Sequence, residues 1–320
     1  MTQFITRRLL LMLPTALGGI LLIFTMFRVI PGDPVLMMMG GGEGGNINKE
    51  MYDKLRGEMR LDRPVYVQFG LWLKDALQGN LGTSYRTGHN VVEEIKLRFP
   101  TTLTLMAMAL SITILFSIPM GIISALKQDS VIDYALRVIG LSALSMPSFW
   151  LGLLIILLLI SVWQWFPPIT YTSPWADPWV SLQQLALPAL VLGSRPIGVA
   201  MRVLRSSLLE ELRSDYTRTA YAKGLQQRVV VWRHVVPNSF LPTLTFFGLE
   251  AAGLIGGSVI VESLFNVPGI GQLAIAALQN RDFPITQGIL LLVLGFVMII
   301  NLVVDVLYGV IDPRIRYERN

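Results

Sequence analysis

The 320-residue chain contains no cysteine and only two histidines, His89 and His234. Without cysteine it can form neither disulfide bonds nor thiolate metal sites. The H-E-x-x-H, G-x-S-x-G and Walker A motifs are also missing from the sequence. The acidic pairs Glu93–Glu94 and Glu210–Glu211 are adjacent in sequence, and adjacent residues on a helix do not face one another. The sequence therefore disfavours an enzyme and predicts that this chain binds no metal or cofactor.

Charge is also scarce. Only 15% of the residues are charged, against about 25% in a typical soluble domain. Hydrophobic residues make up 53% of the chain, and the mean hydropathy is +0.58. A net charge of +5 is compatible with nucleic-acid binding. In so apolar a chain the simpler interpretation is that the basic residues orient the protein in a bilayer.

Long apolar runs dominate the sequence. A helix needs about 20 apolar residues to cross a bilayer, and six segments of the chain meet that length. They are Leu9–Ile30, Thr101–Leu126, Ala135–Trp163, Leu182–Leu204, Phe240–Val261 and Ile285–Ile311. The first follows Arg7 and Arg8, as a signal peptide would, but it is too long and lacks small residues at its end. The sequence predicts an all-α integral membrane protein with six transmembrane helices.

Lysine and arginine are distributed unevenly among the short loops, which predicts the orientation. One side of the membrane holds Arg7, Arg8, Lys127, Arg137, the basic residues between Arg202 and Arg233, and Arg314, Arg316 and Arg319. On the other side, the loop 161–181 has no lysine or arginine, and the loop 262–284 has only Arg281. Both termini are therefore predicted to be cytoplasmic. A bacterial inner membrane is the expected location.

The segment 31–100 is the predicted extracytoplasmic insert after the first span. Gly40–Gly45 is expected to be a flexible tether, while Asn48–Met59 and Val65–Leu77 have the pattern of short amphipathic helices. In the loop between the third and fourth spans, aromatic residues gather at the expected membrane interface, since amphipathic rings favour the headgroup layer. They are Trp163, Trp165, Tyr171, Trp175 and Trp179. A ligand-stacking cage is the less favoured alternative.

A polar, basic insert separates the fourth and fifth spans. It contains Arg218-Thr-Ala-Tyr-Ala-Lys-Gly224 and, nine residues later, His234-Val-Val-Pro237. Alanine and long side chains favour a short helix at Asp215–Lys223, and Gly224 is suited to cap its end. Leu225 and Val229–Trp232 would lead into a second helical piece, and Pro237 would mark re-entry to the membrane. A loop that only sets topology is the alternative.

This insert resembles the E-A-A-x3-G-x9-I-x-L-P loop of ABC importer permeases, in the R-T-A-x-A-K-G form typical of the peptide-importing branch. Ala220, Gly224 and Pro237 match the general motif, while Arg218, Thr219 and His234 depart from it. Further motifs of the dipeptide/oligopeptide/nickel branch occur in order along the chain. They are Arg28-x2-Pro-Gly-Asp-Pro34, Leu61-Asp-x-Pro64, Gly79-Asn-Leu-Gly-x-Ser84, Arg205-Ser-Ser207, Val261-Glu-x2-Phe-Asn-x-Pro-Gly-x-Gly271, Asn301-Leu-x2-Asp305 and Asp312-Pro-Arg314. The chain is thereby identified as a member of that branch, similar to its first permease subunit.

The resemblance implies a type I importer transmembrane domain. It also implies partners: a second, homologous permease, two cytoplasmic ATPases that bind ATP and Mg²⁺, and a periplasmic or lipid-anchored solute-binding protein. Residues 1–30 would form the cytoplasmic N-terminus and first helix, 31–100 the insert, 101–311 the five-helix core with a coupling loop at 205–237, and 312–320 the tail. The residues expected to couple to the ATPases are Asp215, Tyr216, Arg218, Thr219, Ala220, Ala222, Lys223, Gly224 and Pro237.

Two charged residues lie within predicted spans. Arg195 and Glu250 are at similar depths, about 15 and 18 Å from Arg205 and Asn238 respectively at 1.5 Å per residue. Charged residues inside a membrane usually face the bundle interior or a water-filled cavity. They are expected to line the translocation path, together with Met146 and Pro147, where the third span can bend. A purely structural ion pair, or an Arg195 nearer the interface, are the alternatives.

The expected function is to form half of the pathway for a di- or oligopeptide, or a related solute such as glutathione. A secondary transporter or channel is one alternative, with Glu250 and Asp305 as candidates for ion coupling. A membrane scaffold that transports nothing is another.

Overall fold

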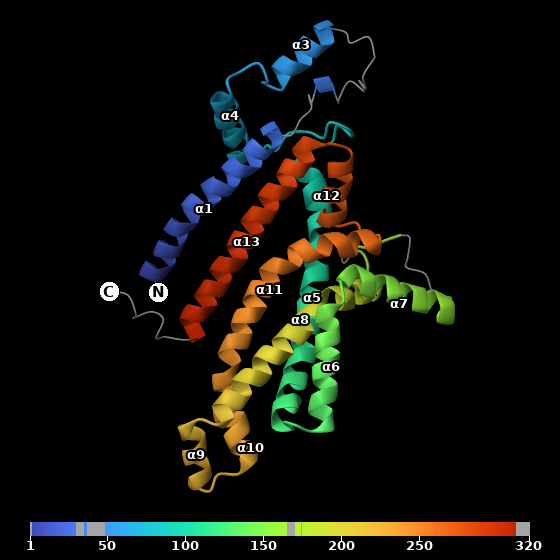
Figure 1. Ribbon diagram of the computed structural model, residues 1–320. Coiled ribbons are helices and arrows are strands. Elements are labelled where there is room, and N and C mark those ends of the chain that lie inside the picture. Colours follow the sequence, from blue (N-terminus) through green and yellow to red (C-terminus); the bar gives the residue numbers. More distant parts are fainter. Residues whose placement is uncertain (1, 30–34, 37–48, 165–169, 174, 312–320) are drawn as a thin grey trace.

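The computed structural model describes residues 2–29, 35–36, 49–164, 170–173 and 175–311. Within these ranges the regular structure is helical (Figure 1), apart from one isolated β-bridge between Thr83 and Asn90. Five helices are long and apolar enough to cross a membrane, and a bent helix pair makes a sixth span if it is counted as one. The all-α fold is confirmed. The tether at Gly40–Gly45, Trp165 and the tail 312–320 lie outside the described residues.

The chain forms five long helices and several shorter ones. The long helices are α1 (Thr2–Val29), α5 (Val91–Leu126), α8 (Pro178–Leu212), α11 (Val236–Leu264) and α13 (Phe283–Ile311). The shorter ones are α3 (Lys49–Glu58), α4 (Val65–Leu77), α6 (Val131–Ser145), α7 (Ser148–Trp163), α9 (Asp215–Ala222), α10 (Gln227–Val230) and α12 (Ile270–Gln279). A single π-helical turn, η1 (Val231–Val235), joins α10 to α11. The helices predicted at Asn48–Met59 and Val65–Leu77 are confirmed as α3 and α4.

The third span, predicted at Ala135–Trp163 with a bend at Met146–Pro147, is divided into two helices. It begins at Val131 and breaks into α6 and α7, whose axes differ by 106°. The break falls at Met146–Pro147, because a residue before proline is disfavoured in the helical conformation, and Met146 has ψ of 126°. The predicted bend is therefore real and much larger than a kink. Figure 1 shows α7 projecting sideways from the other helices.

The core lies where α5, α8 and α11 pack together. Fully buried Leu105, Leu185 and Val261 contribute to it from the three helices. Backbones of α5 and α8 approach closely at Gly193, where an added Cβ would lie 2.7 Å from the carbonyl oxygen of Ala109. Thr113 donates a hydrogen bond to that same carbonyl at 2.8 Å. Small residues thus allow the two longest contacting helices to pack backbone to backbone.

The first helix packs mainly along α13, at the edge of the molecule (Figure 1). Arg8 of α1 forms an ion pair with Asp305 of α13 at 3.0 Å. At the opposite end of α1, Phe24 packs against Phe69 of α4, with ring centroids 5.2 Å apart. The α4 helix of the insert is therefore attached to the bundle through aromatic contacts with α1.

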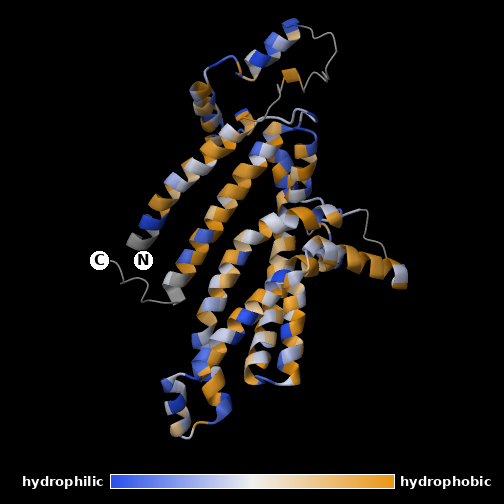
Figure 2. Cartoon of the chain, viewed as in Figure 1, coloured by the Kyte–Doolittle hydropathy of each residue, from blue (hydrophilic) through white to orange (hydrophobic). Residues whose placement is uncertain are grey.

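The α11 helix connects two differently built regions. The α9 end comprises α9, α10 and η1, which precede α11, and it is rich in hydrophilic residues (Figure 2). The α12 end comprises α12 and the loops around it, which follow α11. The sequence predicted only a loop at 262–284, so α12 was missed. Its apolar residues at 270, 273 and 277 have helical spacing and are buried.

The loop before α5 is held firmly to the α12 end. Ser84 is buried and donates a hydrogen bond to the carboxylate of Asp282, which also accepts from the Tyr85 backbone N–H at 3.2 Å. Burial raises the pKa of Tyr85 to about 12, with Arg28 opposing and Asp282 adding to the shift. The Gly79–Ser84 motif of the sequence therefore belongs to a compact, anchored loop.

Candidate functional site

The most distinctive surface of the molecule is the short helix α9, which begins where α8 ends. Ser214 and Thr217 both donate side-chain hydrogen bonds to the carbonyl oxygen of Glu211, at 2.6 and 2.8 Å. That carbonyl belongs to the last turn of α8, where backbone oxygens have no partner within the helix. The two hydroxyls therefore satisfy the end of α8 and fix the angle at which α9 leaves it.

One face of α9 is buried against the bundle. Thr217 is fully buried, and Ala220 is only 9% exposed. Ala220 packs in an apolar cluster drawn from α5, α8 and the last residues of α10 and η1. The other buried members are Ile122, Ala125, Leu204, Leu208, Val230 and Val235. The short helix is therefore tied directly to the ends of two long helices of the core.

The predicted glycine cap at the end of α9 is confirmed. Gly224 has φ of +78°, the left-handed region that glycine adopts most easily. Its N–H donates to the carbonyl of Tyr221 at 2.9 Å, and the N–H of Leu225 donates to that of Ala220 at 3.3 Å. These two bonds form the Schellman motif of helix ends. No atom lies within 4 Å of a Cβ added at Gly224, so only the backbone conformation calls for glycine there.

The opposite face of α9 and the turn after it are exposed. The exposed polar and small residues expected to couple are Asp215, Arg218, Thr219, Ala222, Lys223 and Gly224. Arg218 lies 3.4 Å from Asp215 across one helical turn. Tyr221 and Leu225 add exposed apolar surface beside these charges. The exposed side of α9 therefore combines charged and aromatic side chains, while its opposite side is anchored to the bundle.

Tyr216 connects α9 to both neighbouring helices. Its hydroxyl donates to the carboxylate of Glu211 in α8 and accepts from the side-chain amide of Asn238 in α11, at 3.2 Å. The side chain is 39% exposed, so the network lies at the surface. The sequence singled out Tyr216 but not its partners Glu211 and Asn238, whose positions only the folded chain brings together.

Pro237 stands at the start of α11, after the π-helical turn. Proline has no backbone N–H to donate to the residue four positions earlier. The N–H of Val236 donates to the carbonyl of Val231, five residues back, which widens the helix there. Residues 227–264 nevertheless form one long helical unit. Pro237 thus directly follows a widened turn inside one continuous helical unit, and its role in membrane re-entry stays a prediction.

At the α12 end, a buried carboxylate plays the organising role. Glu262 is fully buried and accepts hydrogen bonds from Thr102 Oγ1 at 2.7 Å and from the backbone N–H of Gly271 at 2.7 Å. A carboxylate at a helix N-terminus complements the positive end of the helix dipole. Glu262 therefore holds the start of α12 against α5. In the sequence, Glu262 could have been singled out only by its place within the Val261–Gly271 motif.

The residues predicted to line a pathway are brought only partly together. Arg195 of α8 is exposed, and Glu250 of α11 is half-buried. They lie on the packed helices α8 and α11, and no ion pair within 4.0 Å joins them in the described part of the chain. Met146 and Pro147 lie at the break between α6 and α7. Asp305, the other acidic residue considered for ion coupling, is instead paired with Arg8.

A buried ion pair that the sequence did not indicate joins α6 to α8. Arg205 donates to both carboxylate oxygens of Asp133, at 2.9 and 2.8 Å. Asp133 is fully buried and also accepts from the Ser124 hydroxyl of α5. Among the described residues, no group of three or more histidine, aspartate or glutamate side chains could hold a metal ion.

Taken together, long apolar helices with a short, partly exposed helix between α8 and α11 form the architecture of a multi-pass membrane protein. The chain belongs to the family of binding-protein-dependent transport system inner membrane components, whose profile matches residues 117–317. A second profile, for the N-terminal part of such membrane components, matches residues 1–106. The predicted identity as a permease subunit of an ABC importer, a non-catalytic membrane component, is confirmed by this membership.

Relatives that match along their full length are also named as permeases. The chain is 39% identical to the di/tripeptide transport system permease protein DppB of Pseudomonas aeruginosa, over 100% of both chains. It is 38% identical to the dipeptide transport system permease protein DppB of Escherichia coli K12, again over 100% of both. The DppB of Alkalihalophilus pseudofirmus is 36% identical, with 99% and 100% covered. A solved inward-facing structure of the MetNI methionine ABC transporter matches with a TM-score of 0.49 and 16% identity, covering 66% of this chain and 93% of that one.

Proposed function

We propose that this chain forms half of the translocation pathway of an ATP-driven importer for di- and tripeptides. The observation that carries the proposal is the full-length similarity to permeases named for dipeptide and di/tripeptide transport. The rigid docking helix α9 supports an ATP-driven machine in particular. Asp305, which a secondary transporter could use for ion coupling, is engaged with Arg8.

The α9 end would receive force from an ATPase subunit. The exposed residues of α9 would lie in a groove of that subunit, while the buried face moves the ends of α5 and α8. Two such ATPases would bind the ATP and Mg²⁺. A second, homologous permease would complete the pathway, and a periplasmic or lipid-anchored binding protein would deliver the peptide at the α12 end.

Uptake measurements test this function. Cells without peptide importers of their own would express the chain with its permease, ATPase and binding-protein partners. We expect uptake of a labelled dipeptide that stops when the ATPase subunits are inactivated. Competition by tripeptides, glutathione or a nickel chelate would identify the preferred solute. Uptake that survives loss of the ATPases but stops with a protonophore would contradict the proposal and favour a secondary transporter.

The proposed orientation has the α9 end and both termini in the cytoplasm. It is supported by the lysine and arginine residues gathered in the short loops of that side. Introduced cysteines can test it, because the native chain has none. Ser84 would be a poor reporter because it is buried, whereas His89 and Gln226 are exposed at opposite ends. In intact cells an impermeant thiol reagent should label His89→Cys alone. Labelling of Gln226→Cys would reverse the orientation.

Arg195 and Glu250 are proposed to face the pathway and to contact the two charged ends of a peptide. Their places on the packed helices α8 and α11 support this role, and Met146–Pro147 would let α6 and α7 shift nearby. Uptake by Arg195→Gln, Glu250→Gln and the double variant tests the idea. We expect each single change to impair transport, with effects that are not additive, because residues sharing an interaction couple energetically. Strictly additive effects would contradict a shared role.

A further inference from the structure

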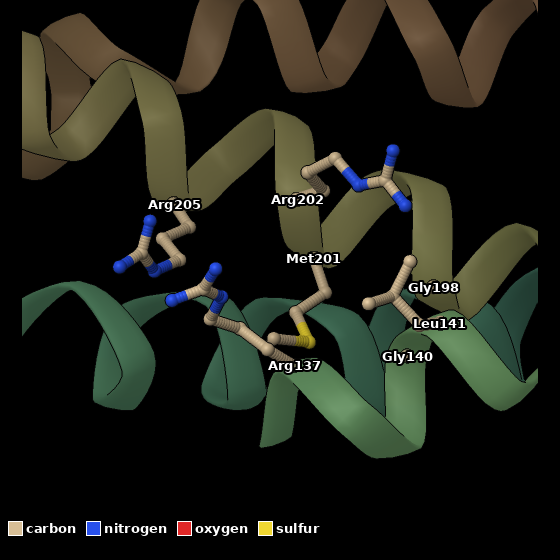
Figure 3. Close-up of a pocket in the computed structure, with 7 residues that line it drawn as sticks. All are labelled: Arg137, Gly140, Leu141, Gly198, Met201, Arg202 and Arg205. Carbon is tan, nitrogen blue, oxygen red and sulfur yellow. The ribbon is translucent and has the colours of Figure 1, made fainter. Parts of the chain in front are cut away.

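An arginine-rich pocket lies between α6 and α8, separate from the docking surface of α9. It has a volume of about 290 Å³ and is lined by Arg137, Gly140 and Leu141 of α6 and by Gly198, Met201, Arg202 and Arg205 of α8. Figure 3 shows the guanidinium groups of Arg137 and Arg205 turned toward one another, with Arg202 extended toward the other end of the pocket. No carboxylate is among the lining residues.

Two glycines build the wall of this pocket. A Cβ added at Gly198 would overlap the carbonyl oxygen of Gly140, and a Cβ added at Gly140 would lie 3.3 Å from the sulfur of Met201. The backbones of α6 and α8 are therefore in direct contact at this level. This close approach brings Arg137 and Arg202, which belong to different helices, to the same small cavity.

The positive charge of the pocket is only partly balanced. Arg205 is neutralised by its bidentate pair with the buried Asp133. Neither Arg137 nor Arg202 has an ion pair or side-chain hydrogen bond within the described ranges of the chain. The guanidinium group of Arg137 lies over the ring of Tyr134, 5.5 Å from its centroid. Arg137 and Arg202 therefore leave two exposed positive charges at one cavity, an arrangement that attracts an anion.

The position of the pocket indicates which anion. At 1.5 Å per residue, Arg137 lies about 9 Å from the start of α6 and Arg205 about 10 Å from the end of α8. With the ends of α6 and α8 at the cytoplasmic membrane surface, as in the proposed orientation, these depths would fall near the boundary between the headgroup layer and the hydrocarbon core. On the same face of α6, Tyr134, Val138 and Leu141 are 53%, 61% and 50% exposed. An apolar surface suited to acyl chains therefore borders the arginines.

We propose that this pocket binds the phosphate group of an acidic phospholipid, with Arg137 and Arg202 as the residues that hold it. The planar guanidinium group matches phosphate oxygens in a bidentate geometry. Arg205, fixed by Asp133, would supply a third positive edge. The exposed apolar face of α6 would receive the acyl chains. The proposal is independent of the transported solute, so it can be tested whether or not peptide uptake is found.

The test uses the complete transporter, solubilised in neutral detergent and stripped of lipid. Unfolding temperature and native mass spectrometry would be followed while phosphatidylglycerol, phosphatidylcholine or inorganic phosphate is added. Only phosphatidylglycerol should bind and stabilise strongly. Its apparent affinity should fall about fivefold in Arg137→Gln or Arg202→Gln and about 30-fold in the double variant, as expected for each basic residue near an acidic lipid. Both side chains are exposed, so the lipid-free variants should unfold at the wild-type temperature.

Matched controls separate this site from general charge effects. Arg7→Gln removes an exposed charge near the start of α1, and it should leave lipid affinity unchanged. Inorganic phosphate that stabilises the wild type but not the double variant would support an anion site filled from solution. Equal stabilisation by phosphatidylcholine and phosphatidylglycerol would overturn the proposal. So would a double variant that binds phosphatidylglycerol as the wild type does.

Discussion

Two short helices, α9 and α12, lie at opposite ends of α11, and each is bordered by glycine for a different reason. Gly224 after α9 has a positive φ and open space around it. Gly271 in the first turn of α12 has no room for a side chain, because an added Cβ would lie 2.9 Å from the backbone nitrogen of Val259 and overlap its Cα. One glycine is required by backbone conformation and the other by packing.

The two helices also differ in how they are held. The start of α12 is fixed by the buried carboxylate of Glu262, whereas α9 is tied at the surface by the half-exposed Tyr216. Buried hydrogen bonds cost more to break than exposed ones. The comparison indicates that the start of α12 is built into the buried core, whereas α9 has one face buried and the other exposed to solvent. Substitutions at the two ends should therefore differ in size and kind.

The largest effect is expected for Glu262→Ala. The change leaves the Thr102 hydroxyl and the Gly271 N–H buried without their acceptor, at about 1–3 kcal/mol each. The transporter should lose about 4 kcal/mol of stability and be scarce in the membrane. Thermal unfolding of the purified complex and its abundance in membranes would measure this. Glu262→Gln keeps an acceptor oxygen and should retain more stability. Equal loss in both variants would mean that the charge, not the hydrogen bonds, is required.

Gly271→Ala should destabilise by about 2 kcal/mol, since the new methyl group would overlap the backbone of Val259 and crowd the hydrogen-bonded carboxylate of Glu262, and neither can move aside easily. Gly256→Ala is the matched control, because nothing lies within 4 Å of a Cβ added there. Unfolding temperatures of the two variants provide the measurement. If Gly256→Ala were the more damaging, the steric account of the α12 end would be wrong.

Gly224→Val should lower the free energy of unfolding by about 1–2 kcal/mol, because a β-branched residue is strained at positive φ. The strain should be confined to the end of α9. We expect the protein to reach the membrane normally while ATP hydrolysis is no longer coupled to uptake. The ratio of transported peptide to hydrolysed ATP in proteoliposomes measures that coupling. Gly224→Asn should behave almost as the wild type, since asparagine tolerates this conformation. Normal coupling in Gly224→Val would show that the Gly224 cap is not required for coupling ATP hydrolysis to uptake.

The smallest effect is expected for Tyr216→Phe. The change removes the bonds to Glu211 and Asn238 but keeps the ring, and it should cost about 1 kcal/mol. Uptake should decrease a few-fold while the unfolding temperature hardly changes. The hydroxyl of Tyr221 has no hydrogen bond among those described. Comparison with Tyr221→Phe therefore separates the effect of losing the hydrogen-bond network from the general effect of losing a tyrosine hydroxyl. Identical behaviour of the two variants would show that the network does not matter.

Much of the fold could be predicted from local sequence. The apolar runs are long enough to identify the spans, and periodicity located α3 and α4 on either side of Pro64. The Gly224 cap was predictable because a Schellman motif depends on residues within six positions of one another. The break at Met146–Pro147 was predicted as a bend, but its size was not, because packing of α6 against α8 and of α7 against the core sets the angle.

Other features depended on contacts between distant residues. Glu262 and Thr102 are far apart in sequence, as are Arg205 and Asp133, so their buried hydrogen bonds could not be derived from spacing. The arginines of the α6–α8 pocket were predicted only as markers of orientation. They converge because Gly140 and Gly198 let two helices touch.

The sequence by itself determined that this chain is an apolar helical permease with a basic, glycine-capped helix between its fourth and fifth spans. Hydrophobic length and short-range backbone preferences are local properties, so they can be read along the chain. Tertiary structure alone decided which polar groups are buried together, which glycines are required by packing, and which charges share a cavity. Those features arise where helices far apart in sequence meet, and side-chain geometry at such contacts is fixed only by the folded bundle.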